Sequence, residues 1–87
     1  MATVFIPAQM REMTGGIERV EIEAVNVRQI VDALEGHFPG IRARLCVGDA
    51  LSPALQVSID GQMTTRGLTA KVKPRSEVHF VPAIGGG

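Results

Sequence analysis

The helix-forming part of this sequence is residues 26–38, which read NVRQIVDALEGHF. Asn26 is a favourable N-cap, and Gln29 occupies the position of its capping-box partner. Pro39-Gly40 ends the helix. The apolar residues at helical spacing are Val27, Ile30, Val31, Leu34 and Phe38. A stripe of this kind has to be covered, so we expect the helix to pack on a sheet.

Short strands are predicted on both sides of this helix. They share β-branched or alternating side chains and turn signals at their ends. The predicted strands are residues 3–6, 19–24, 55–59, 62–65 and 77–81. Asp60-Gly61 is a strong hairpin-turn signal, whereas residues 41–53 predict a short helical turn and irregular chain. The order hairpin, helix, hairpin, strand indicates an α+β fold and is compatible with several small folds of that class, the ubiquitin-like β-grasp among them.

Length and composition place the chain in a broad class. Its 87 residues are 45% hydrophobic, which suits one domain with a modest core. The single cysteine, Cys46, excludes an internal disulfide and a cysteine-rich zinc site. We find neither a signal-peptide pattern nor a run of about 18 apolar residues. We therefore expect a cytoplasmic protein that does not enter a membrane.

Charge is unevenly distributed although the net charge is zero. Residues 1–39 carry three arginines against six acidic residues, and residues 40–87 carry six basic residues against three acidic ones. Such asymmetry informs on association and not on fold. Either it is a mixed solvated surface, or a basic group helps the C-terminal end to find an acidic partner. The residues of that group are Arg66, Lys71, Lys73 and Arg75. With three aromatic residues and no Trp or Tyr, the chain does not resemble a base-stacking nucleic-acid binder.

No pattern in the sequence indicates an enzyme or a metal site. The only histidines, His37 and His79, lack acidic neighbours at ligand spacing and are expected at the surface or half-buried. Cys46 is interpreted as a small buried apolar residue. Phosphate-loop and nucleophile-elbow motifs are both missing from the sequence. We therefore expect no catalytic and no metal-binding residues in this chain.

The sequence ends in Ala83-Ile84-Gly85-Gly86-Gly87, and three glycines cannot build a core. We predict a folded domain over residues 1–82 and a flexible glycine tail over residues 83–87. A tail of this kind is either a frayed end or a working part. Because its glycines lack Cβ atoms, they can thread a narrow channel in a partner, and the terminal acyl carbon is unhindered for a nucleophile.

The segment 77–87 resembles the ending of the ThiS/MoaD family of ubiquitin-like sulfur carriers, in which a short strand and a proline precede a diglycine. Ile6-Pro7-Ala8 and Thr14-Gly15-Gly16 resemble the start of the MoaD branch, and Pro39-Gly40-Ile41 adds similarity in the middle. Gly85 departs from the alanine frequent there. The resemblance implies a β-grasp fold: a mixed sheet of four to five strands, with its first and last strands paired at the centre, covered by one main helix.

The resemblance also implies a function for the tail. A ubiquitin-activating-type enzyme would use ATP and magnesium to adenylate Gly87, recognising Gly85 and Gly86. Sulfur would then replace AMP to leave a thiocarboxylate on Gly87. A sulfur-accepting enzyme would consume it, of the molybdopterin synthase large-subunit, cysteine synthase or thiazole synthase type. The MoaD-like ends favour molybdopterin, and cysteine synthesis follows closely.

Two other functions fit the same tail, namely a protein modifier conjugated through Gly87 and a non-catalytic β-grasp interaction module. Partner contacts are predicted at Phe80, Pro82 and Ile84, which lie on one side of an extended chain at the strand period of two. For Phe80 a place in the core is the competing interpretation. Ile84 follows the last predicted strand and has little to pack on.

Overall fold

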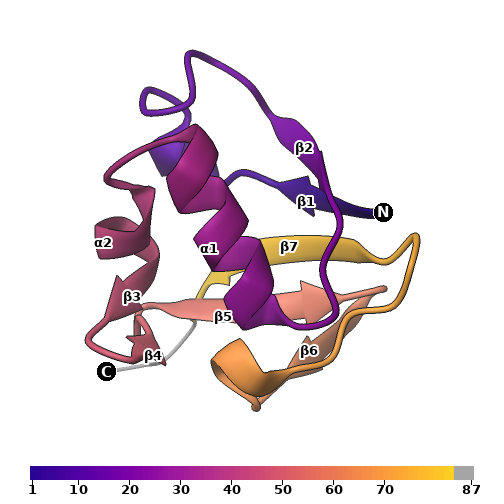
Figure 1. Ribbon diagram of the computed structural model, residues 1–87. Coiled ribbons are helices and arrows are strands. Elements are labelled where there is room, and N and C mark those ends of the chain that lie inside the picture. The colour runs from indigo at the N-terminus through magenta and orange to yellow at the C-terminus, as the bar shows by residue number, and fades with distance from the viewer. Residues whose placement is uncertain (84–87) are drawn as a thin grey trace.

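The protein is described by a computed structural model over residues 1–83, in which a five-stranded mixed sheet is covered on one face by a helix, α1 (Figure 1). The strand order is β2-β1-β7-β5-β6. The sheet strands are β1 (Ala2–Phe5), β2 (Arg19–Ile22), β5 (Leu55–Ile59), β6 (Gln62–Thr64) and β7 (Glu77–Pro82). The remaining elements are α1 (Val27–His37), α2 (Ile41–Leu45), the small hairpin β3 (Cys46–Val47) and β4 (Ala50–Leu51), and the 3-10 turns η1 (Ala8–Met10) and η2 (Gly67–Thr69).

The last strand occupies the middle of the sheet. β7 runs parallel to β1, with Val4 opposite Val78, and antiparallel to β5, with Val57 opposite Phe80. The predicted pairing of the first and last strands at the centre of a β-grasp sheet is therefore confirmed. This arrangement holds β7 by backbone hydrogen bonds along both of its edges.

Helix α1 begins where the sequence predicts. The Asn26 side chain accepts a hydrogen bond from the Gln29 backbone N–H at 2.8 Å, which satisfies one of the first-turn donors. Gln29 Oε1 in turn accepts from the Val25 N–H at 2.9 Å. In a standard capping box it would accept from the N-cap residue, so the reciprocal bond here is displaced by one residue.

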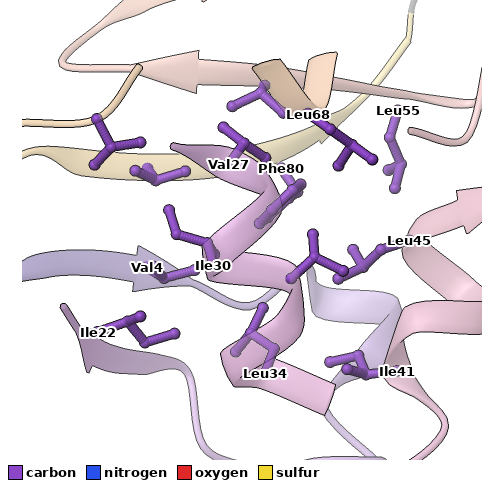
Figure 2. Close-up of a cluster of buried hydrophobic side chains, with 14 of the residues drawn as sticks. Val4, Ile22, Val27, Ile30, Leu34, Ile41, Leu45, Leu55, Leu68 and Phe80 are labelled. Atoms are coloured by element: carbon purple, nitrogen blue, oxygen red, sulfur yellow. The ribbon is translucent and has the colours of Figure 1, made fainter. Parts of the chain in front are cut away.

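The apolar stripe of α1 forms the core with the inward side chains of the sheet. Ile30 and Leu34 are 0% and 1% exposed, and they pack over Val4 and Phe80, which come from the two central strands (Figure 2). Burying each such side chain stabilises the fold by about 2 kcal/mol. The sheet would otherwise expose this face to water, so α1 is what completes the domain.

The region 41–53 is more ordered than the sequence predicts. It contains the predicted helical turn, α2, but also the hairpin β3–β4 around Gly48. The Glu35 carboxylate accepts hydrogen bonds from the backbone N–H groups of Gly40 and Arg42, at 3.0 and 2.9 Å. These bonds satisfy donors at the start of α2 that have no partner within the helix, and they join α2 to α1.

The turn between β5 and β6 agrees with the sequence. Asp60 and Gly61 have φ angles of 52° and 84°, as a type I′ hairpin turn requires at both of its central positions. Asp60 also closes a network, because its carboxylate accepts from the Ser76 hydroxyl at 2.8 Å and from the Glu77 N–H at 2.9 Å. The turn is thereby tied to the start of β7. Across residues 1–83 we find no helix of the length and apolarity that crossing a membrane demands.

Candidate docking face and the base of the C-terminal segment

The central strand carries the chain to one end of the sheet, where its last described residue is held in place. Val81 and Pro82 pair with Gln56 and Leu55, and the Ala83 N–H donates to the Ala54 carbonyl at 2.9 Å. The backbone is thus fixed as far as residue 83. Whatever follows Ala83 starts from a defined point on the domain, next to the beginning of β5.

The predicted site residues lie outside the described part of the chain, at its surface or in its core. Ile84, Gly85, Gly86 and Gly87 lie outside the described residues, and they make up the predicted tail together with Ala83. Pro82 is exposed at the end of β7, where a partner can reach it.

The position of Phe80 in the structure corrects the prediction that its side chain contacts a partner. Its side chain is 4% exposed and belongs to the core beneath α1 (Figure 2). Strand alternation turns the neighbouring Val81 to the opposite face of the sheet, where it is half-buried. The accessible apolar residues of this strand are therefore Val81 and the exposed Pro82.

The face of the sheet opposite α1 carries an ordered row of side chains. Strand register places Phe5 beside His79, His79 beside Ser58, and Ser58 beside Met63, with Arg19 next to Phe5 at the other end. Met63 is 58% exposed. We call the five residues Arg19, Phe5, His79, Ser58 and Met63, together with Val81, the outer face.

Two aromatic rings form the middle of the outer face. Phe5 and His79 stack with ring centroids 4.1 Å apart and planes 6° apart. His79 Nε2 lies 3.6 Å from a carboxylate oxygen of Glu77. Periodicity in the sequence does not predict this pair, because nothing in the local pattern shows that strands so distant in the chain are neighbours.

The remaining candidate for chemistry, Cys46, is buried in the core as predicted. Burial raises the pKa of its thiol, so the reactive thiolate form is disfavoured. His37 is exposed on α1. In the part of the chain that the structure describes, no three His, Cys, Asp or Glu side chains gather in a way that could hold a metal ion.

Comparison with known proteins agrees with this geometry. The profile of the ThiS family matches residues 4–87, which run from the second half of β1 through the central strand to the terminal glycines. The chain belongs to the ThiS family. A comparison of this ThiS-family protein with curated protein sequences found no match.

Solved structures with the same fold include two from CysO proteins and complexes. A chain in the crystal structure of the BexX/CysO complex of Amycolatopsis orientalis is 34% identical over 100% of both chains, with a TM-score of 0.89. Mycobacterium tuberculosis CysO is 24% identical, covers 97% of this chain and 100% of its own, and has a TM-score of 0.86.

An archaeal modifier shares the architecture as well. The small archaeal modifier protein 1 of Methanosarcina acetivorans is 21% identical over 99% of this chain and 95% of its own, with a TM-score of 0.78. At that identity the similarity concerns the fold alone. The family match shows membership of the ThiS family, and the three solved structures support the ubiquitin-like β-grasp fold.

Proposed function

We propose that this protein is a sulfur carrier that works through Gly87. In the first step the Gly87 carboxylate attacks the α-phosphate of ATP in an activating enzyme, with magnesium present, and pyrophosphate leaves. In the second step sulfide attacks the acyl carbon, and AMP leaves. If a persulfide is the donor, its attack expels AMP and forms an acyl disulfide, and a thiol then cleaves the S–S bond and leaves as a disulfide with the donor. The product is a Gly87 thiocarboxylate, and a sulfur-accepting enzyme then takes that sulfur.

The observation that carries this proposal is the anchoring of the backbone at Ala83 ahead of a family match that runs to Gly87. Four residues separate the anchor from the reacting carboxylate, and a fully extended chain of four residues spans at most about 14 Å. An activating enzyme therefore has to bring its ATP within that distance of the domain. The required approach makes the surface around Ala83 a part of the recognition.

The outer face is the surface that we assign to this docking. It offers the Phe5–His79 stack and the exposed Met63, and Val81 continues the apolar surface toward the anchor at Ala83. Aromatic residues and Met are enriched in protein interfaces. The helix-covered face of the sheet is occupied by the core, so a partner that reaches the tail from the sheet side meets the outer face first.

The pathway is proposed from similarity. The 34% identity to a chain of the BexX/CysO complex supports the CysO-like branch over the molybdopterin branch that the ends of the sequence favoured. We therefore propose an acceptor of the cysteine synthase type. The complex with BexX supports the broader idea that a chain of this kind forms a stable assembly with a partner enzyme.

The experiment that tests the proposal is intact-mass spectrometry of the purified protein after incubation with an activating enzyme, ATP, magnesium and sulfide. Replacement of one oxygen by sulfur raises the mass by about 16 Da, as expected for a covalently carried acyl group. A variant that lacks both Gly86 and Gly87 is the matched control and should show no gain. An unchanged mass with an enzyme that activates another carrier in parallel would overturn the proposal.

A second incubation distinguishes the carrier from a protein modifier. If the protein is incubated with a cell extract and ATP, a modifier appears as larger conjugates that depend on Gly87. Free chain with the thiocarboxylate mass, and no conjugates, is the expected result for a carrier.

A further inference from the structure

A groove lies beside the edge strand β6, on the side of the sheet that faces the connection from η2 to β7. It has a volume of about 450 Å³. Ile59 and Thr64 belong to its lining on the sheet side, and Ala70 and Lys71 line it from the connection. Ala70 of this lining belongs to the core and Met63 to the outer face, whereas the basic side chains of the groove serve neither.

Three cations converge on the groove from segments that are separate in the sequence. Arg66 follows β6, whereas Lys71 and Lys73 come from the connection to β7, and all three are exposed. Within residues 1–83, no carboxylate lies within 4 Å of these three charges. The positive charge of the groove is therefore available to an external anion.

The one carboxylate in the lining is already engaged. Asp60 accepts from the Ser76 hydroxyl and from the Glu77 N–H. The hydrogen bonds from Glu77 and Ser76 hold the Asp60 carboxylate at the turn and lower its pKa, so this group stays ionised. Counting this charge, the lining remains positive, and residues 61–76 contain four basic and no acidic side chains.

The edge of the sheet supplies the second half of the site. β6 has a neighbour, β5, on one side only. In an antiparallel ladder, alternate residues of an edge strand direct their N–H and C=O groups away from the neighbour, where an extended chain can pair with them. Gln62, Met63 and Thr64 make up this strand and also line the groove. An extended partner would thus meet backbone hydrogen-bonding groups and cations along the same line.

We propose that this groove, which we call the β6 groove, binds an extended acidic segment of a partner protein by strand addition to β6. The acidic side chains of that segment would face Arg66, Lys71 and Lys73. Ile59 offers an apolar surface for a residue between them. The positive charge selects an acidic chain, and the open strand edge selects an extended one.

The β6 groove and Ala83, the last described residue, lie at opposite ends of β5. Ala83 bonds beside the start of β5, and Asp60 follows its end. Five residues of strand separate these points, which is about 17 Å. One partner can therefore hold the domain by the β6 groove while Gly87 enters a site elsewhere, and the proposal stands independently of the sulfur chemistry.

Nuclear magnetic resonance titration of the full chain tests this proposal. The probe is a synthetic peptide of alternating Glu and Val, and a Lys-Val peptide of equal length is its control. We expect the acidic peptide to shift the amides of residues 62–64 and 70–73 and to slow hydrogen exchange of alternate β6 amides. Affinity should fall with salt, because exposed charges are screened. Shifts centred elsewhere, or equal binding of the basic peptide, would overturn the proposal.

Charge reversal locates the interaction. Lys71→Glu with Lys73→Glu should weaken the acidic peptide at least fivefold. Arg75→Glu is the matched control, because Arg75 is exposed in the same basic segment but does not line the groove. It should change affinity less than twofold. If both variants weaken binding equally, the peptide is attracted by the charge of the whole basic segment, and the proposal of a defined site in the β6 groove is wrong. Tighter binding of a single-stranded oligonucleotide than of the peptide would also overturn it, in favour of nucleic acid.

Discussion

Phe5 stacks on His79 across the first and last strands of the sheet, with the rings 4.1 Å apart and nearly parallel. The contact exists because β1 and β7 are parallel neighbours. It lies on the face that α1 does not cover. The pair therefore contributes to the stability of the strand junction and also forms the accessible surface that we assign to an activating partner.

The stack should appear as a coupling energy. In a double-mutant cycle of Phe5→Ala and His79→Ala, we expect an interaction of about 0.5–1.5 kcal/mol in the free energy of unfolding, measured with urea. The cycle of Phe5→Ala with Gln56→Ala is the control. Gln56 lies on β5 opposite Val81 and should be additive with Phe5. Additivity in both cycles would contradict a stabilising stack.

Phe80 and Val81 are neighbours in β7 with opposite environments, so they should respond differently to truncation. Phe80→Ala empties a core position that is 4% exposed and should cost about 3–5 kcal/mol. Val81→Ala should cost about 1 kcal/mol, because its side chain is half-exposed. Thermal and urea unfolding measure both. If Phe80→Ala is as stable as Val81→Ala, the core position of Phe80 is contradicted and the predicted partner contact is favoured.

The N-cap of α1 has a measurable share in stability. Asn26→Ala removes the acceptor of the Gln29 N–H and should lower the free energy of unfolding by about 1 kcal/mol. Asn26→Asp keeps an acceptor and should remain close to wild type. Equal losses in the two variants, measured by urea unfolding, would show that the side chain does not act as a cap.

Asp60 should make stability depend on pH. Hydrogen bonds from Glu77 and Ser76 lower its pKa in the folded state, so its contribution is present above the ordinary aspartate pKa of about 3.9 and is lost as pH falls through the folded value. Asp60→Asn keeps the hairpin-turn preference and removes the charge. The Tm of wild type should exceed that of Asp60→Asn at neutral pH, and the gap should narrow below pH about 4. A gap of constant size would contradict the linkage.

The terminal residue is expected to matter for chemistry and not for folding. Gly87→Ala adds a Cβ beside the acyl carbon that must reach ATP. We expect the same Tm as wild type and adenylation at least about tenfold slower, which corresponds to about 1.4 kcal/mol. Pyrophosphate release measures the rate. Ile84→Asp should also slow adenylation, because Ile84 is predicted to contact the partner. Normal turnover of Gly87→Ala would contradict the steric role of glycine, and normal turnover of Ile84→Asp would contradict the partner contact.

Local signals in the sequence predicted the individual elements well. The Asn26 cap, the helical stripe and the Asp60-Gly61 turn each depend on neighbouring residues, and each is found in the structure. The hairpin β3–β4 was missed because two-residue strands are too short to show alternation. Its position depends on packing against α2 and on the bond from Ser52 N–H to the Leu45 carbonyl.

Arrangements between distant segments were not predictable from periodicity. Pairing of β1 with β7 was expected only from the family resemblance, and the Phe5–His79 stack follows from that pairing. Convergence of Arg66 with Lys71 and Lys73 on one groove likewise requires the path of the connection in three dimensions. The sequence showed a basic segment, but it could not show which of its charges line a common surface.

The central position of β7 also determines when the protein can fold. Residues 77–82 are the last strand of the sheet to be synthesised, and both β1 and β5 need them to complete their hydrogen bonding. A nascent chain on the ribosome therefore cannot close its sheet until this strand emerges, since non-local pairs form only when both members are present. Copies interrupted before residue 77 would lack the middle of the sheet and stay open to proteolysis. Only chains that include β7 can therefore complete the sheet, and these chains resist proteolysis better than chains that end before it.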